Sequence, residues 1–198
     1  MTIEFTLPAE LEAHDPPEAR GTPRDGVRML VSRGSTGQIS HHRFAELPGL
    51  LRPGDLVVVN TSGTLPAAVR AVDPTGPAGR RGVKLAVHFS GPRPDGGWLA
   101  ELRAIRGPAT VPYPGGQPGD RIELPAGARL TLDERVTGRL WRARLSTAVV
   151  PYLLRYGVPI RYSYVRQDWP LAAYQTVFAT RPGSAEMPSA SRPFTPRW

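Results

Sequence analysis

Proline and glycine interrupt this chain so often that long helices are excluded. The 198 residues include 23 Pro and 21 Gly, well above average usage. Because Pro removes a backbone donor and Gly favours turns, this frequency predicts short elements joined by turns. Hydrophobic residues still make up 40% of the chain, which is enough to bury a core, so we expect a folded chain and not a disordered one.

Several function classes are excluded by what the sequence lacks. There is no Cys, hence no disulfide and no thiolate site. No run of 18 apolar residues and no signal peptide is found, so we expect a cytoplasmic protein outside the membrane, and a monomer. A phosphate loop, a Gly-x-Ser-x-Gly elbow and a His-Glu-x-x-His motif are missing as well. The adjacent His41 and His42 would face opposite ways in a strand, and His88 is expected on the wet face of its strand, so no metal site is predicted.

The first third of the chain reads as short α/β elements. Val27 to Arg33 is strand-like, and Gln38 to Ser40 would return after a turn as a hairpin. Residues His42 to Leu51 form a short amphipathic segment. The β-branched run Leu56 to Val59 is typical of a strand covered on both faces.

The sequence pattern changes at Leu65. From there on, short segments of alternating apolar and polar residues are separated by turns. The predicted strands are Val83 to Phe89, Trp98 to Ile105, Arg121 to Leu124, Arg129 to Leu132 and Arg139 to Leu145. In the first of these, Val83, Leu85, Val87 and Phe89 would share the inner face. We therefore interpret residues 65–146 as a small antiparallel β domain. A helix is predicted from Thr147, as its N-cap, to Tyr156, and a short one from Leu171 to Ala179.

The charge distribution suggests a nucleic-acid surface. The net charge is +8, and Lys84 is the only lysine, so 25 − 1 = 24 cations are Arg. No acid occurs between Arg135 and Gln167, whereas arginines and aromatic residues alternate there. Guanidinium groups neutralise phosphates and aromatic rings stack on bases, but a solvated arginine-rich face over an aromatic core explains the pattern equally well. The candidate RNA-binding residues are Arg142, Arg144, Arg161 and Arg166.

A series of segments, in order, resembles one enzyme family. The matching segments are Phe5-Thr6-Leu7-Pro8, Arg28-Met29-Leu30-Val31, Thr36-Gly37-Gln38-Ile39-Ser40-His41 with Phe44, Leu51-Arg52-Pro53-Gly54-Asp55-Leu56 with Val59-Asn60, and Tyr174-Gln175-Thr176-Val177-Phe178-Ala179, followed by Pro182-Gly183-Ser184, Pro188-Ser189-Ala190 and Phe194-Thr195. Together they resemble the S-adenosylmethionine:tRNA ribosyltransferase-isomerases of queuosine biosynthesis. The resemblance covers both ends of the chain and is weak across the β domain.

This resemblance implies a fold and an activity. The fold would be a mixed α/β domain formed by both chain ends, residues 1–64 and 147–198, with a small antiparallel β-barrel domain, residues 65–146, inserted. The enzymes of this family transfer and isomerise the ribosyl moiety of S-adenosylmethionine onto the aminomethyl-deazaguanine base of tRNA, giving epoxyqueuosine with release of adenine and methionine. S-adenosylmethionine is then a cosubstrate, tRNA a partner, and no metal is needed. The sulfonium acidifies the neighbouring ribose carbon, so the protein supplies positioning and a proton acceptor.

The resemblance also implies candidate site residues. Tyr174 could stack on a base, Gln175 could read the edge of a base, and Thr176 completes that motif. We expect Asn60 and the Tyr174–Thr176 stretch to line one pocket where the two chain ends meet. Backbone N–H groups of a loop at Gly183 and Ser184 could bind an anion. The remaining substrate-binding candidates are Arg192, Phe194 and Thr195.

The chain departs from the family pattern at several positions. After Asn60 the family reads Asp-Thr-Arg-Val-x-Pro-Ala-Arg, where this chain has Thr61-Ser62-Gly63-Thr64-Leu65-Pro66-Ala67-Ala68. The histidine of Pro-Thr-Ala-Gly-Leu-His-Phe-Thr is Pro193 here, and the family's later motifs are missing. The catalytic residue is therefore unknown from sequence. Two alternatives stay open: a paralogue acting on another acceptor, and a truncated, non-catalytic remnant that binds RNA or a nucleoside.

Overall fold

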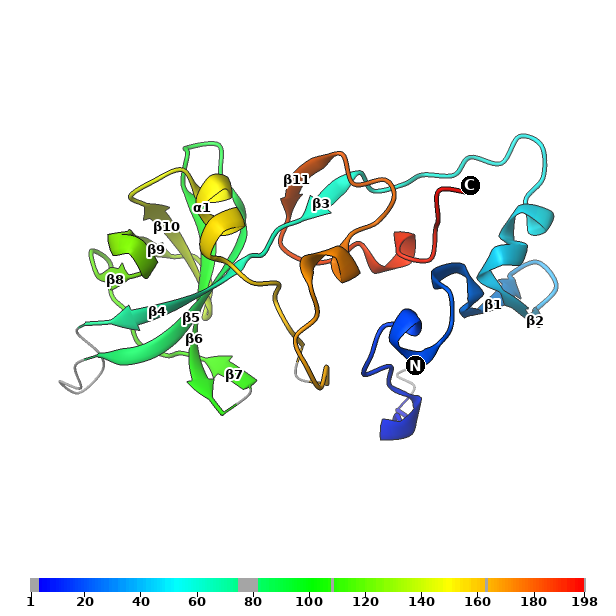
Figure 1. Cartoon of the computed structure of the whole chain (residues 1–198), viewed down its shortest axis with the longest axis horizontal. Helices are drawn as coiled ribbons and strands as arrows, with labels where there is room; N and C mark the ends of the chain where they lie inside the picture. Colours follow the sequence, from blue (N-terminus) through cyan, green and yellow to red (C-terminus); the bar gives the residue numbers. More distant parts are fainter. Residues whose placement is uncertain (1–3, 75–81, 108, 163, 198) are drawn as a thin grey trace.

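The protein is an elongated arrangement of short strands and turns. The computed structural model describes residues 4–74, 82–107, 109–162 and 164–197. A seven-stranded sheet lies at one end, a two-stranded parallel pair in the middle and a two-stranded hairpin at the other end (Figure 1). Among the described residues, α1 (Val149–Tyr156) is the one α-helix. The described 3-10 turns are η1 (Ala9–Leu11), η2 (Pro17–Arg20), η3 (Arg24–Gly26), η4 (Phe44–Leu50), η6 (Pro125–Gly127), η7 (Leu171–Tyr174) and η8 (Ser189–Ser191).

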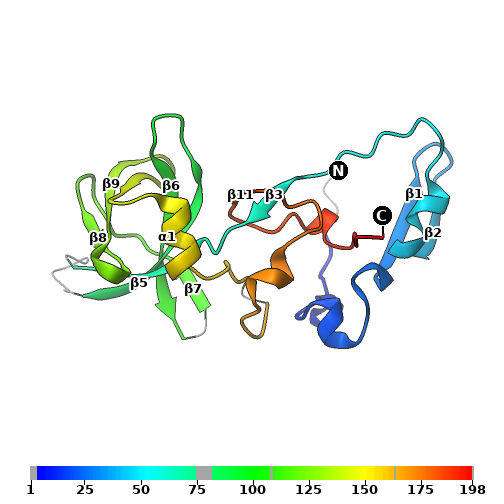
Figure 2. The ribbon, with the colours of Figure 1, turned by 45° about the horizontal axis from the view of Figure 1, so that its top comes forward.

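The large sheet is antiparallel throughout. Its strands are β4 (Ala68–Asp73), β5 (Val83–Pro92), β6 (Trp98–Arg106), β7 (Ala109–Pro112), β8 (Arg121–Glu123), β9 (Arg129–Arg135) and β10 (Leu140–Leu145), in the order β10-β9-β8-β4-β5-β6-β7. Strand β10 also pairs with β6, where Trp141 lies opposite Ala100. The pairings therefore run in a circuit from β10 through β9, β8, β4, β5 and β6 back to β10, and the sheet is visibly curved (Figure 2).

The hydrophobic core lies inside this curved sheet. The predicted inner residues Leu85, Val87 and Phe89 are fully buried, which confirms the alternation read from the sequence. Trp141 of β10 packs in the same cluster and is 1% exposed. The five strands predicted in this region are confirmed as β5, β6, β8, β9 and β10, with ends shifted by a few residues.

Helix α1 ties the end of the sheet region to its beginning. Its residues Tyr152 and Leu153 are buried, and the Tyr152 hydroxyl donates to the Pro125 carbonyl at 2.9 Å. After Gly157 the chain pairs again with β4, since Val158 and Ala68 exchange both backbone hydrogen bonds, at 2.9 and 3.0 Å. The helix begins two residues later than predicted, and Thr147 is not its N-cap. The reason is that the strand pairing extends through Ser146, whose N–H donates to Arg129.

The two chain ends meet in the middle of the molecule. Strand β3 (Ser62–Thr64) pairs in parallel with β11 (Arg181–Ser184), so segments far apart in sequence lie side by side (Figure 1). An aromatic cluster supports the same meeting. The Phe194 ring packs edge-on against Phe44, at 4.8 Å between centroids, and against Phe178 at 5.1 Å.

The predicted hairpin is confirmed. Strands β1 (Arg28–Arg33) and β2 (Gln38–Arg43) pair antiparallel. The turn between them ends at Gly37, whose φ of 70° suits glycine. Downstream of the hairpin, η4 replaces most of the predicted amphipathic segment His42 to Leu51.

Two predicted elements are wrong. The run Leu56 to Val59 is an extended connection with Leu56 87% and Val58 84% exposed. It was expected to be covered, but within the described part of the chain it pairs with no strand, so Val57 and Val58 remain in solvent and Val59 is half-buried. The predicted helix Leu171 to Ala179 is limited to η7, because Gln175 is extended, with ψ at 150°.

Candidate functional site

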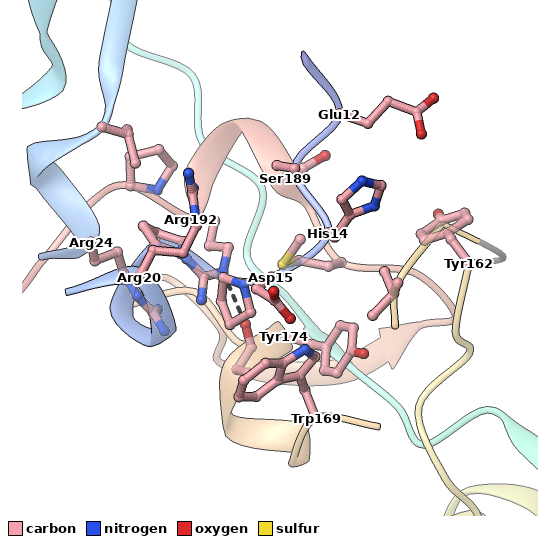
Figure 3. A pocket seen from close by; sticks show the side chains of 18 of the residues that line it. Glu12, His14, Asp15, Arg20, Arg24, Tyr162, Trp169, Tyr174, Ser189 and Arg192 are labelled. Atoms are coloured by element: carbon pink, nitrogen blue, oxygen red, sulfur yellow. Dashed lines mark hydrogen bonds between the residues drawn. The ribbon is translucent and has the colours of Figure 1, made fainter. Parts of the chain in front are cut away.

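A pocket of about 820 Å³ opens where the two chain ends meet. Most of its walls come from residues 10–28 of the N-terminal segment, from residues 159–162 and 164–174, and from residues 185–193, and Arg43 and Thr64 complete the lining. Figure 3 shows the arginines at the left, Trp169 and Tyr174 at the bottom and Tyr162 at the right, with Asp15 near the centre and His14 between Asp15 and Tyr162. The pocket is therefore polarised, with a cationic end and an aromatic end.

The cationic end is built around one carboxylate, Glu18, which follows Pro17 in η2. Arg24 and Arg192 each form an ion pair with it, at 2.9 Å from separate oxygens. Burial opposes the charged form of Glu18, but hydrogen bonds from its own backbone, Arg192 and Arg24 together hold its pKa below the ordinary value. Two guanidinium groups share this one carboxylate, and Arg20 also lines the pocket, so the arginines outnumber Glu18 at this end.

Arg192 and Arg24 are held in place by backbone carbonyls as well. The Arg192 Nε donates to the Ala173 carbonyl at 2.9 Å, and Arg24 Nη1 donates to the Gln175 carbonyl at 2.8 Å. Arg192 is 9% exposed. Such bonds fix the orientation of a guanidinium before any ligand arrives, which reduces the entropy lost on binding.

The aromatic end combines stacked rings with an unused donor. Tyr162 and Tyr164 stack with centroids 5.5 Å apart and planes 7° from parallel. Burial, together with the hydrogen bond from Tyr162 to Glu186 at 2.7 Å, raises the pKa of Tyr162 to about 12. The buried indole Nε1 of Trp169 has no hydrogen-bond partner among the described residues. A buried hydrogen-bond donor without a partner lowers the stability of the folded chain. This donor belongs to a residue of the pocket wall.

Tyr174 lies beside Trp169 in the same wall (Figure 3). Burial raises the pKa of its hydroxyl, the charge of Asp168 raises it further, and Arg161 opposes both. The phenol therefore stays protonated at neutral pH and can donate a hydrogen bond.

The structure brings only part of the predicted set together at this pocket. Of the predicted substrate-binding residues, Tyr174 and Arg192 line it. Asn60, expected on the same pocket as Tyr174, is not among the lining residues. It is exposed, and its Oδ1 accepts from the Ser62 N–H at 2.8 Å, which is the geometry of a turn-forming asparagine.

Gln175 is engaged with the backbone of β3. Its Oε1 accepts from the Thr64 N–H at 2.9 Å, and its Nε2 donates to the Thr64 carbonyl at 2.8 Å. The side-chain amide thus pairs with Thr64 as a neighbouring strand would. Thr176 is buried, with no hydrogen-bond partner for its Oγ1 within the described residues. Base reading by Gln175 stays a prediction, and only the second donor and lone pair of its amide are left for it.

Gly183 and Ser184 lie in strand β11 and not in a loop, so that expectation is corrected. The Ser184 carbonyl accepts from the Leu65 N–H at 2.8 Å, continuing the parallel pairing with β3. Phe194 belongs to the aromatic cluster described above, and the Thr195 hydroxyl lies 3.5 Å from Asp25. Anion binding at Gly183 and Ser184 remains a prediction.

Three of the four candidate RNA-binding arginines face carboxylates. Arg144 pairs with Asp133 at 2.8 Å. Arg142 lies 3.5 Å from Asp95 and 3.8 Å from Glu134. Arg161 lies 3.1 Å from Asp168, and Arg166 is exposed. The carboxylates that pair with these arginines lie outside the acid-free stretch of the sequence. Counting charges within that stretch alone therefore overstates the positive charge around the arginines. RNA binding by these residues stays a prediction.

His88 departs from its predicted wet position. It is half-buried on β5, and burial together with the nearby Arg103 charge lowers its pKa to about 4. Its cross-strand neighbour is Glu101, which accepts from Arg103 at 2.7 Å. His88 belongs to this polar cluster of the sheet and does not line the pocket.

Sequence reasoning missed His14, Glu18 and Trp169 as site residues. They are scattered singly along the chain, and only the meeting of its two ends brings His14 and Trp169 to one cavity and Glu18 to the arginines that line it. The available signal was weak: Trp169 is a large aromatic residue between Asp168 and Pro170, in a region that is rich in aromatic residues. Among the described residues, no cluster of three or more His, Asp or Glu side chains could hold a metal ion. In the same part of the chain, no helix has the length and apolarity needed to cross a membrane.

Comparison with known proteins identifies the family. The model of a family described as "Queuosine biosynthesis protein" matches residues 1–198, the full length of the chain. The chain belongs to this queuosine biosynthesis family. Its members include the S-adenosylmethionine:tRNA ribosyltransferase-isomerase of Thermus thermophilus, 34% identical over 98% of this chain. The protein of the same name from Rubrobacter xylanophilus is 35% identical, also over 98% of this chain.

The chain spans about half the length of the curated relatives it matches, 53% of both of these proteins. Among solved structures, an S-adenosylmethionine tRNA ribosyltransferase from Thermotoga maritima matches with 22% identity and a TM-score of 0.36. That match covers 77% of this chain and 47% of the other.

Proposed function

We propose that this queuosine-family chain binds S-adenosylmethionine in the pocket between its two ends. On that basis it transfers and isomerises the ribosyl moiety onto the aminomethyl-deazaguanine base of tRNA, giving epoxyqueuosine with release of adenine and methionine. The relatives' names support ribosyl transfer and isomerisation between S-adenosylmethionine and tRNA, and the acceptor base and the products follow from the family resemblance. The observation that carries the proposal for this chain is the polarity of the pocket.

The chemistry of S-adenosylmethionine matches that polarity. Adenine is a flat aromatic ring, which suits the Trp169 and Tyr174 rings in the pocket wall. The methionine carboxylate suits the cationic end at Arg20, Arg24 and Arg192. The ribose and the sulfonium would then lie in between, where Asp15 offers a negative charge. The volume of about 820 Å³ is within the range of small-molecule pockets, roughly 300–1,000 Å³.

The domain organisation implied by the family resemblance agrees with the strand pairings of residues 65–146. We infer that these residues form an inserted small β-barrel domain, and that residues 1–64 and 147–198 form the second domain. The closed circuit of pairings through β10 and β6 favours a barrel. The β3–β11 pairing and the Phe44–Phe194 contact favour a single domain built from both ends. The +8 charge suits tRNA as the partner.

The test is adenine release from S-adenosylmethionine, followed by chromatography, with tRNA that carries the aminomethyl-deazaguanine precursor. We expect release that requires this tRNA, and none with tRNA that lacks the precursor base. Failure to release adenine by a chain that still binds S-adenosylmethionine contradicts the transfer reaction for this chain alone.

A second candidate is the same chemistry on another acceptor. It is favoured by the sequence after Asn60, where Thr61 and Gly63 replace an acid and an arginine of the family pattern. Adenine release with the free deazaguanine base, or with another amine, but not with the precursor tRNA supports this candidate over the first.

A further inference from the structure

His14 is held in the pocket in one tautomer. Its Nδ1 lies 2.7 Å from the backbone carbonyl oxygen of Tyr164. A carbonyl oxygen can only accept, so Nδ1 carries the proton and donates it. In the neutral ring, Nε2 then bears a lone pair and can accept a proton. His14 lines the pocket and is half-buried.

The surroundings fix the ring from both sides. Along the chain, Pro16 and Pro17 lie two and three residues after His14, and Pro17 is buried. The proline rings restrict the backbone dihedral angles of this segment. On the other side, the Tyr164 carbonyl belongs to a loop held by the Tyr162–Tyr164 ring stack and by the Val165 N–H bond to the Tyr162 carbonyl at 3.1 Å. A proton acceptor has to be held in this way to act efficiently.

The position of His14 along the pocket matters as much as its tautomer. It lies next to Asp15, which Figure 3 shows between the arginines and Tyr174, and on the side of Asp15 that faces Tyr162. In the orientation proposed above, adenine and carboxylate occupy the two ends, so the ribose and the sulfonium are next to His14. The acidic C–H of the ligand is on the ribose carbon attached to that sulfonium.

We propose that His14 is the catalytic proton acceptor, an assignment that rests on the proposed function. Its Nε2 lone pair takes the proton from the ribose carbon bonded to sulfur, and the electron pair of that C–H bond stays on the carbon. The positive sulfur stabilises the resulting carbanion as a neutral ylide, while the imidazole becomes imidazolium. Charge is conserved, since one positive charge moves from the ligand to His14, where the Asp15 carboxylate lies beside it.

The other described histidines do not fit this role. Both ring nitrogens of His42 are engaged, by Ser40 at 2.9 Å and Glu46 at 2.9 Å. His41 lies in the same hairpin and His88 in the large sheet, and neither lines the pocket. Of the other pocket carboxylates, Glu186 already accepts from Tyr162, and Glu10 and Glu12 are exposed to solvent. Asp15 is the alternative acceptor, and the test has to separate it from His14.

The experiment measures deuterium uptake at that ribose carbon of S-adenosylmethionine in D₂O by NMR, together with adenine release and calorimetric binding. The informative variant is His14→Asn, whose amide can still donate to Tyr164 but has no basic nitrogen. We expect exchange and release to fall by about 100-fold or more, while affinity for S-adenosylmethionine changes less than about threefold. His41→Asn is the matched control and should leave all three unchanged.

The outcomes separate the two proposals. If His14→Asn keeps the exchange rate and Asp15→Asn abolishes it, Asp15 is the acceptor and the His14 assignment is overturned while the proposed function stands. If His14→Asn retains both exchange and release, the assignment is also overturned. An unaltered chain that neither binds S-adenosylmethionine nor releases adenine overturns the proposed function and the assignment together.

Discussion

At the residue scale, the Tyr174-Gln175-Thr176 motif stabilises the fold and also contributes to the pocket. Within Tyr174-Gln175-Thr176, the Tyr174 ring lines the pocket, whereas the Gln175 amide binds both backbone groups of Thr64. The Tyr174 carbonyl also accepts from the Thr64 hydroxyl at 2.9 Å. This stretch therefore joins β3 to the pocket wall through three hydrogen bonds.

Replacing Gln175 by Ala tests that role. It leaves the N–H and carbonyl of the buried Thr64 without their partner, so we expect the free energy of unfolding to fall by about 1–3 kcal/mol. Urea denaturation measures it, with the exposed Gln167→Ala as control, expected within about 0.5 kcal/mol of the unaltered chain. A Gln175→Ala chain with unchanged stability and lost ligand binding would instead assign this amide to the ligand.

His88 makes stability depend on pH. Its pKa is about 4 in the folded chain, against an ordinary value of 6.5, so the unfolded chain binds more protons between these values and stability rises with pH there. We expect up to about 3 kcal/mol to be lost as pH falls from 6.5 to 4, and the loss to be smaller in His88→Gln. Denaturant midpoints at a series of pH values measure it. Parallel profiles for the two chains would show that His88 does not carry the dependence.

At the element scale, the junction between α1 and β4 sets how the sheet region joins the rest. Gly157 ends the helix, and its α-carbon is so close to Pro66 that an added Cβ would lie 1.9 Å from the Pro66 carbonyl oxygen. No rotation of a side chain relieves a contact with backbone, so the helix end would have to move away from β4. The neighbouring Val158–Ala68 hydrogen bonds depend on that distance.

Gly157→Ala is therefore expected to destabilise the chain by more than about 2 kcal/mol, or to prevent its folding. Gly138→Ala is the matched control, because nothing lies within 4 Å of a Cβ at that position. Thermal unfolding followed by circular dichroism compares the two variants. Equal melting temperatures would mean that the close approach at Gly157 is not required.

How far the sequence predicts each element depends on where its partners lie. Strands β5 and β6 were predictable because alternation along one strand reports its own buried face. The same reasoning failed for the run Leu56 to Val59. An apolar run indicates a strand that is buried on both faces, but it does not show whether the fold provides neighbouring strands to bury it. The Arg142 and Arg144 ion pairs, and the meeting of His14 with Trp169, depend on distant residues. No local pattern contains that information.

At the scale of the whole molecule, stability is concentrated in the large sheet and the long connection contributes little. Leu56 and Val58 are almost fully exposed, whereas Val87 is fully buried. We expect the double variant Leu56→Ser, Val58→Ser to change the free energy of unfolding by less than about 0.5 kcal/mol. Val87→Ala should cost about 2 kcal/mol. A large loss in the serine variant, measured by urea denaturation, would show that the connection is buried in solution.

The pocket is also a property of the whole molecule, because its walls belong to segments separated by more than a hundred residues. Calorimetric titration with S-adenosylmethionine measures it most directly, on the unaltered chain and on Trp169→Phe and Trp169→Ala. We expect one molecule to bind, with lower affinity in Trp169→Phe, which has a smaller aromatic ring, and with affinity lower by about tenfold or more in Trp169→Ala, which has no ring. The absence of binding, or equal affinity in all three chains, would contradict this site.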